Sequence, residues 1–222
     1  MSSKSVIAID AMGGDFGPAV VVPGALQAAR ECGAKVLLVG GECAVRDALA
    51  ALPAAERDEE LFEIVPASQV VEMWEKPSEI LRTKKDSSIQ VACRLVKQGK
   101  ADAIVSAGHS GAAVACGMFI LGRIPGVERP ALATILPTEK KPVLLLDVGA
   151  NVECRPHHIF QFALMGSTFA QDLLGYETPR VGILSIGEEE GKGNSLVKSS
   201  YDLLKLTQDI NFLGNVEGRD LF

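Results

Sequence analysis

The chain has 222 residues, enough for one large domain or two small ones. Hydrophobic residues make up 47% and charged residues 23%, which is typical of globular proteins and excludes disordered and fibrous chains. The 22 Lys and Arg against 28 Asp and Glu give a net charge of −6, so no overall positive field attracts nucleic acid.

Short apolar runs alternate along the chain with segments whose apolar residues recur every three or four positions. This alternation predicts an α/β fold, a three-layer αβα arrangement with a mostly parallel sheet, as a single domain over residues 1–222. The predicted strands are Val6–Asp10, Lys35–Val39, Phe62–Pro66, Ala103–Ser106, Ala131–Leu136, Val143–Asp147, Val181–Ile186 and Ile210–Leu213. The predicted helices are Val20–Glu31, Ala44–Leu52, Ser88–Gln98, Gly111–Leu121, His157–Leu174 and Ser195–Thr207.

Other segments bear on compartment and completeness. The N-terminus lacks the apolar region of a signal peptide, and the stretch 103–122 holds too many polar residues and glycines for a membrane span, so we expect a cytoplasmic protein. The five cysteines include no Cys-x-x-Cys pair, which argues against disulfides and zinc. Residues 75–86 fall outside the alternation and are expected to form a helix and a loop. The last residues follow a strand without a covering helix, which predicts an incomplete chain.

Four strand ends carry polar, glycine-rich sequence, and ligands of open α/β sheets bind beyond such ends. At the first, Gly13 and Gly14 lie between Asp10 and Asp15. Paired glycines let the backbone approach a ligand closely, and the two carboxylates share the loop. The alternative is a tight turn with solvated aspartates.

The second strand end runs from Ser106 through Gly108 and His109 to Ser110 and Gly111. Backbone N–H groups at a helix start, with two hydroxyl groups beside them, form a natural phosphate site. The Gly-x-Ser-x-Gly pattern of a nucleophile elbow does not occur here. His109 is as well explained by a hydrogen-bonded loop histidine as by a catalytic one.

The third strand end places Asp147 before a glycine turn and Asn151. An asparagine amide there is able to donate a hydrogen bond to a developing oxyanion, although Asp and Asn are also ordinary turn residues. The segment 154–158 that follows contains Cys154, His157 and His158, for which capping of the next helix is favoured over metal binding.

The fourth strand end is the loop 187–195, where Glu188, Gly191, Lys192 and Asn194 are candidate binding residues. The spacing of its glycines does not match an ATP-binding P-loop. Three consecutive glutamates repel each other and any phosphate, so we expect some of them to point away from Lys192. The alternative is a solvated acidic loop.

These segments together resemble the PlsX family of bacterial acyl-ACP:phosphate acyltransferases. The resemblance is carried by the segments 9–18, 106–112, 128–131, 146–152 and 186–193. It implies a fold similar to phosphotransacetylases and isocitrate/isopropylmalate dehydrogenases, a homodimer, no cofactor and no metal. The implied activity transfers a fatty acyl group from acyl carrier protein to inorganic phosphate, giving acyl phosphate for phospholipid synthesis.

Two departures from the family pattern stand out. The family usually has Asn-Thr where this chain has His109 and Ser110. Family members also continue beyond residue 222, through a further motif and an apolar region linked to peripheral membrane contact, so we expect a C-terminally truncated chain.

The reaction implied by the resemblance needs a positioned phosphate and a stabilised oxyanion, without a covalent nucleophile. We expect the turn 106–111 and Lys192 to hold phosphate, and Asn151 to support the oxyanion. Asp10, Asp15 or Asp147 is expected to orient these donors or relay a proton. The remaining residues expected to bind substrate are Gly13, Gly14, Glu188, Gly191 and Asn194.

The resemblance also implies a docking surface for acyl carrier protein, and three alternative functions are considered beside it. Acyl carrier protein is acidic, so it would dock on a local basic patch such as Arg82, Lys84 and Lys85. The first alternative is a phosphotransacetylase-like enzyme that uses acyl-CoA. The second is a non-catalytic acyl-carrier-binding module. A metal- and NAD-dependent dehydrogenase is less favoured, because the sequence has neither a Gly-x-Gly-x-x-Gly fingerprint nor an evident cluster of metal carboxylates.

Overall fold

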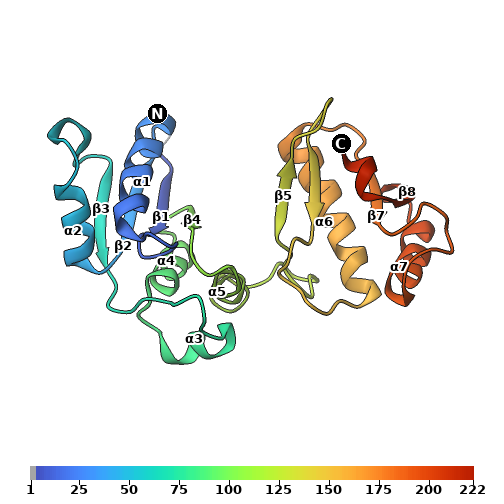
Figure 1. Ribbon diagram of the computed structural model, residues 1–222, viewed down its shortest axis with the longest axis horizontal. Helices are drawn as coiled ribbons and strands as arrows, with labels where there is room; N and C mark the ends of the chain where they lie inside the picture. The colour runs from blue at the N-terminus through green and yellow to red at the C-terminus, as the bar shows by residue number, and fades with distance from the viewer. Residues whose placement is uncertain (1–3) are drawn as a thin grey trace. The chain divides into compact units, whose positions relative to one another are not determined.

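The computed structural model describes residues 4–222 and divides the chain into two compact units (Figure 1). Unit 1 is Met1–Ile124 and unit 2 is Pro125–Phe222. Assignment of residues 1–222 to a single domain stays a prediction.

Unit 1 is built on a four-stranded, fully parallel sheet with the order β3-β2-β1-β4. The strands are β1 (Val6–Asp10), β2 (Lys35–Gly40), β3 (Phe62–Pro66) and β4 (Ala103–Ser106). The helices are α1 (Pro18–Cys32), α2 (Glu42–Ala50), α3 (Pro77–Thr83), α4 (Ser88–Lys97) and α5 (Ser110–Cys116). A short 3₁₀-helix covers Ala54–Glu56, and a π-helical turn, Gly117–Leu121, continues α5.

The two faces of this sheet are covered by different helices because side chains alternate along a strand. Val36 and Leu38 of β2 pack in one cluster with Leu26 of α1. Leu37 points the other way and packs in a second cluster with Ala92 of α4. Unit 1 therefore has three layers. The central strands β1 and β2 are covered on both faces, as expected of a parallel sheet, whereas Val105 on the edge strand β4 is 54% exposed.

Unit 2 contains two strand pairs and two helices. Strands β5 (Ala133–Leu136) and β6 (Val143–Leu146) are antiparallel, whereas β7 (Arg180–Leu184) and β8 (Asn211–Val216) are parallel. Helix α6 (Pro156–Leu174) runs beside β5 and β6, α7 (Ser195–Leu206) precedes β8, and a 3₁₀-helix covers Gly218–Leu221 (Figure 1).

The prediction of an α/β fold with a mostly parallel sheet is confirmed, and all predicted strands and helices are found close to their expected bounds. The pair β5–β6 differs, because residues 137–142 are too few for the crossover that parallel neighbours need. The run Val143–Leu146 is half-buried instead of covered on both faces. The expected helix in the segment 75–86 is α3.

No helix within residues 4–222 is both long and apolar enough to cross a membrane.

Candidate functional site

The ends of β1 and β4 bring the first two predicted segments together in unit 1. Asp10 and Ser106 are register partners on these neighbouring strands. Asp10 is only 4% exposed, and its Oδ2 accepts a hydrogen bond of 2.7 Å from Ser106 Oγ. Ser106 Oγ in turn accepts a hydrogen bond of 3.2 Å from the backbone N–H of Gly108. Parallel strands end at the same edge of the sheet, which explains why residues 96 positions apart meet.

Two glycines allow the loops after these strands to touch. A Cβ at Gly13 would lie 2.8 Å from the Gly108 nitrogen and 2.9 Å from Asp10 Oδ2. A Cβ at Gly108 would lie 3.0 Å from Gly13 Cα. Gly14 has a φ of +84° beside Ala107, a conformation that favours glycine. The Gly13–Gly14 pair therefore serves close backbone packing, and Asp15 is exposed on the same loop.

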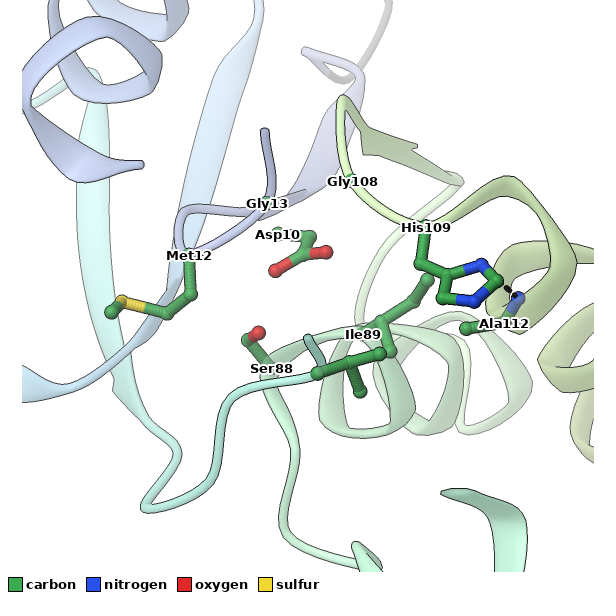
Figure 2. Close-up of a pocket in the computed structure, with 9 residues that line it drawn as sticks. Asp10, Met12, Gly13, Ser88, Ile89, Gly108, His109 and Ala112 are labelled. Atoms are coloured by element: carbon green, nitrogen blue, oxygen red, sulfur yellow. Dashed lines mark hydrogen bonds between the residues drawn. The ribbon is translucent and has the colours of Figure 1, made fainter. Parts of the chain in front are cut away.

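A small pocket opens beside Asp10, with a volume of about 10 Å³ (Figure 2). Its walls come from the two loops, the segment before α3 and the first turn of α4. The second oxygen of Asp10, Oδ1, is buried and has no hydrogen-bond partner among the described residues. The residues that line the pocket are Asp10, Met12, Gly13, Val71, Ser88, Ile89, Gly108, His109 and Ala112. We refer to it as the Asp10 pocket.

Both ring nitrogens of His109 are engaged. Its Nδ1 accepts a hydrogen bond of 3.4 Å from the backbone N–H of Ala112, which caps α5. Because Nδ1 is an acceptor, the proton resides on Nε2, which donates to the Glu75 carbonyl at 2.9 Å. Both hydrogen bonds fit a hydrogen-bonded loop histidine, and a substrate contact of His109 stays a prediction. Ser110 and Gly111 form the first turn of α5.

Lys84, one of the three residues of the expected basic patch, forms an ion pair with Glu75. Glu75 Oε2 accepts hydrogen bonds from the Glu72 N–H and from Lys84 Nζ, which lower the pKa of the Glu75 carboxyl. Lys84 Nζ also donates to the Val70 carbonyl. Lys84 is thus committed within unit 1, while Arg82 and Lys85 are exposed.

In unit 2, Asp147 organises the turn after β6. Its Oδ1 accepts from the backbone N–H groups of Leu132 at 2.7 Å and Ala150 at 3.2 Å, and its Oδ2 accepts from the Asn151 N–H at 2.8 Å. Burial raises the pKa of the Asp147 carboxyl, but these donors outweigh burial and hold the pKa below its ordinary value. Asp147 is therefore stabilised as a carboxylate.

The side chain of Asn151 is also used within this turn. Its Nδ2 donates to the Pro130 carbonyl at 2.8 Å and to Asp147 Oδ2 at 3.3 Å. An amide group has two N–H bonds, so both are occupied. Support of an oxyanion by Asn151 requires one of these two hydrogen bonds to be exchanged for the substrate.

The segment before α6 confirms a capping role for one of its two histidines. His158 is 3% exposed, and its Nδ1 accepts from the Arg155 N–H at 3.1 Å. Its Nε2 lies 2.9 Å from Glu128 Oε2 and donates to it, which joins the segment 128–131 to α6. His157 is exposed and stacks on Phe160.

Two of the three consecutive glutamates in the loop 187–195 form ion pairs. Glu188 pairs with Arg219 at 3.1 Å, and Glu190 pairs with Lys205 at 2.7 Å. Lys192 is exposed, and within residues 4–222 no hydrogen bond or ion pair of its Nζ is found. We expected some of these glutamates to point away from Lys192, and in the structure Glu188 and Glu190 pair with other cations.

The last predicted residue of this loop, Asn194, caps α7. Its Oδ1 accepts a hydrogen bond of 3.0 Å from the Val197 N–H. Gly191 is exposed on the same loop.

The structure gathers the predicted residues of unit 1 into one place and those of unit 2 into two loops. In unit 1 the Asp10 pocket is also lined by Ser88 and Ile89, which were not predicted from the sequence as site residues. The sequence feature that could have indicated these two residues is the pair of serines at the start of α4. Such a pair predicts a helix N-terminus, but it does not predict that this N-terminus lies close to β1.

Comparison with known proteins identifies close relatives. The model of the family described as "Fatty acid synthesis protein" matches residues 5–222. The chain is 69% identical over 220 residues to "Phosphate acyltransferase" of Nitratidesulfovibrio vulgaris (strain DP4), covering 99% of this chain and 63% of that protein. It is 67% identical to "Phosphate acyltransferase" of Lawsonia intracellularis, covering 100% of this chain and 63% of that protein. The chain thus spans about 63% of the length of these curated relatives.

Solved structures with a similar fold share much less sequence. A EutD phosphotransacetylase from Staphylococcus aureus matches with a TM-score of 0.66 and 19% identity over 96% of this chain and 68% of that chain. A branched-chain phosphotransacylase from Enterococcus faecalis V583 matches with a TM-score of 0.60 and 16% identity, covering 96% and 67%. At this identity the likeness concerns the fold alone. The family match and the high identities show that the chain belongs to the fatty acid synthesis protein family, the PlsX family that its motifs resemble.

Proposed function

We propose that this chain is part of a phosphate acyltransferase that transfers a fatty acyl group from acyl carrier protein to inorganic phosphate. The observation that carries the proposal is the 69% identity over 220 residues to a protein named phosphate acyltransferase. The arrangement in unit 1 supports it, because glycine-rich loops, a helix N-terminus and a buried carboxylate surround the Asp10 pocket.

The proposed reaction exchanges one acyl bond for another. A phosphate oxygen attacks the thioester carbonyl carbon, a C–O bond forms, and the C–S bond breaks. The proton of hydrogen phosphate ends on the departing thiol, and acyl phosphate is the product. Because phosphate is itself the nucleophile, the enzyme has to position it and stabilise the charge on the carbonyl oxygen.

The proposed roles follow from the hydrogen bonds of each group. Ser106 directs its only hydroxyl proton to Asp10. The donors proposed for phosphate on its turn are therefore the Ser110 hydroxyl and the backbone N–H groups of Ser110 and Gly111, in the first turn of α5. Lys192 is proposed as a phosphate cation. Asn151 is proposed to donate to the oxyanion after release of the Pro130 carbonyl.

The other proposed roles are supporting ones. Asp147 positions Asn151 through their two hydrogen bonds, and Asp15 remains a candidate for proton relay. Binding contributions from the loop residues Gly13, Gly14, Glu188, Gly191 and Asn194 are part of the same proposal.

Partners are proposed from the same reaction. Acyl carrier protein, as an acidic donor, would dock on exposed cations such as Arg82 and Lys85. A homodimer is checked by analytical ultracentrifugation, and peripheral membrane contact is checked by co-sedimentation with lipid vesicles.

The decisive experiment measures phosphate-dependent acyl phosphate formation from palmitoyl-acyl carrier protein, with hydroxylamine as the trap. The 222-residue chain is compared with the longer relative from Nitratidesulfovibrio vulgaris, and palmitoyl-CoA is the alternative donor. Product from acyl carrier protein in preference to CoA supports the proposal. Preference for CoA favours a phosphotransacetylase-like enzyme, and binding of acyl carrier protein without product favours a non-catalytic module.

A further inference from the structure

Asp10 presents a buried oxygen that no group in the described part of unit 1 satisfies. The side chain is 4% exposed, and Oδ2 is bonded to Ser106, whereas Oδ1 has no partner among the described residues. A buried acceptor without a donor costs the full desolvation of that group. A ligand that donates a hydrogen bond at Oδ1 therefore gains more than it would in water.

The donors on the loop after β4 that lie nearest to Asp10 are committed to other partners. The hydroxyl proton of Ser106 goes to Oδ2, and the N–H of Gly108 goes to Ser106 Oγ. The Nε2–H of His109 goes to the Glu75 carbonyl. The donor for Oδ1 is consequently expected to come from outside these groups.

The N-terminus of α4 favours a negatively charged ligand in the Asp10 pocket. Ser88 and Ile89, the first two residues of this ten-residue helix, line the pocket opposite Asp10 (Figure 2). A helix N-terminus carries about half a positive charge and attracts anions. This end of α4 disfavours a cation beside Asp10, although a carboxylate alone would attract one.

Pocket size limits what reaches Oδ1. A volume of about 10 Å³ holds about one water-sized group, so a single oxygen of a larger anion fits and the rest of the anion stays outside. An anion that satisfies both the helix end and the carboxylate must carry a proton on that oxygen. Hydrogen phosphate has such a P–OH group at neutral pH, whereas sulfate has none.

We propose that the Asp10 pocket recognises phosphate through its protonated oxygen and thereby discriminates against sulfate. The P–OH group donates to Asp10 Oδ1, while the negative oxygens lie toward the N-terminus of α4. In a sulfate ion an oxygen lone pair would face the carboxylate at the same position. This inference rests on the proposed function, because it takes phosphate to be a ligand of this chain.

The first test compares ligands on the unaltered 222-residue chain by isothermal titration calorimetry at pH 7.5. The ligands are phosphate, sulfate and monofluorophosphate, a tetrahedral dianion like hydrogen phosphate that lacks the hydroxyl. We expect phosphate to bind at least about tenfold more tightly than either of the others, as for loss of one hydrogen bond to a charged group. Equal affinities, or no binding of phosphate, would overturn the inference.

The second test changes the acceptor. Asp10→Asn places an amide in the pocket that is able to donate to an unprotonated oxygen, so the preference for phosphate over sulfate should fall at least about tenfold. Asp47→Asn is the matched control, because Asp47 is exposed on α2 and loses the same charge in the same unit. An unchanged preference in Asp10→Asn contradicts the inference. Circular dichroism checks that the variant folds, and if it does not, the ligand series on the unaltered chain decides.

The two proposals fail separately. Acyl phosphate formation together with equal affinity for the three anions leaves the acyltransfer proposal intact and removes the role of Asp10. Selective phosphate binding without acyl phosphate from any donor retains the Asp10 pocket as a phosphate site and removes the acyltransfer proposal.

Discussion

At the scale of single residues, two carboxylates at strand ends have opposite surroundings. Asp147 accepts hydrogen bonds from three backbone N–H groups and from Asn151. Within residues 4–222, Asp10 accepts one hydrogen bond, from Ser106, and its buried Oδ1 has no partner. The first arrangement stabilises a turn, and the second is suited to a ligand that carries a proton.

Replacement of Asp147 by Asn tests the first arrangement through pH. The pKa of the Asp147 carboxyl is lowered in the folded chain, so its stabilisation is complete above the unfolded pKa of about 3.9 and is lost as pH falls through the folded value. We expect Asp147→Asn to reduce the free energy of unfolding at pH 7 by about 1–3 kcal/mol, with a smaller difference from the unaltered chain at pH 3. Urea unfolding at both pH values measures this. The control Asp172→Asn, at an exposed position of α6, should leave the free energy of unfolding unchanged at both pH values. Equal losses of stability at both pH values in Asp147→Asn would argue against a stabilising carboxylate at this position.

Replacement of Lys192 by Ala tests the proposed phosphate cation. If the exposed ammonium group contacts phosphate, the apparent KM for phosphate should rise about tenfold or more in the hydroxylamine assay with a catalytically active protein. Lys198→Ala on α7 removes an exposed lysine nearby in sequence and serves as the control. Unchanged phosphate kinetics in Lys192→Ala would remove this residue from the site.

A methyl group at Gly13 tests the close approach of the two loops. Its Cβ would lie 2.8 Å from the Gly108 nitrogen, so Gly13→Ala should lower the free energy of unfolding by about 1–3 kcal/mol. Gly24→Ala, within α1 and with open space around its Cβ, should leave stability equal or raise it by up to about 1 kcal/mol. Chemical denaturation compares the two, and similar effects would show that the loops accommodate a Cβ.

At the scale of elements, two predicted site residues turn out to begin helices. His109 caps α5 through Nδ1, and Asn194 caps α7 through Oδ1. Polar residues after a strand are typical both of ligand sites and of helix caps, because in α/β units the same loop ends one element and starts the next. Capping and binding are therefore separable only by experiment.

Asn194 offers that separation. Asn194→Ala should lower the free energy of unfolding by about 1 kcal/mol, and Asn194→Asp should restore it, because Asp is as good a cap as Asn. Thermal denaturation measures both variants. If Asn194→Asp retains stability but loses acyl phosphate formation, Asn194 binds substrate in addition to capping α7.

At the scale of the whole molecule, buried apolar side chains are unevenly distributed. The three core clusters found among residues 4–222 all belong to unit 1. In unit 2 the buried apolar side chains are fewer: Phe162, Ala170, Ile183 and Leu204. Since burial of apolar area is the main stabilising contribution, unit 1 has the larger share of it.

This distribution predicts that residues 1–124 fold without the rest of the chain. The isolated segment should unfold cooperatively with urea and keep its helical circular dichroism signal, whereas residues 125–222 alone should show a weaker or non-cooperative transition. A non-cooperative transition of the isolated segment 1–124 would show that its core depends on unit 2.

The order of strands and helices could be predicted from the sequence by itself, because the burial that produces the pattern is local. The run Val36–Val39 of β2 is apolar without interruption since both faces of that strand are covered, and helices such as α4 repeat their apolar residues at helical spacing. The positions of Asp10, Ser106 and Asp147 at strand ends were therefore predictable as well. The motifs also placed the chain in its family.

Only the tertiary structure decided which of these residues meet and which of their atoms are already bonded. The register of β1 with β4 joins Asp10 to Ser106, and the packing of α4 adds Ser88, through contacts between residues far apart in the chain. The antiparallel pairing of β5 and β6 likewise depends on a short connection and not on the apolar run itself. A sequence pattern reports burial one residue at a time, whereas the partners of a hydrogen bond depend on geometry across the fold. For that reason the unpartnered oxygen of Asp10 and the occupied amide of Asn151 became visible only in three dimensions.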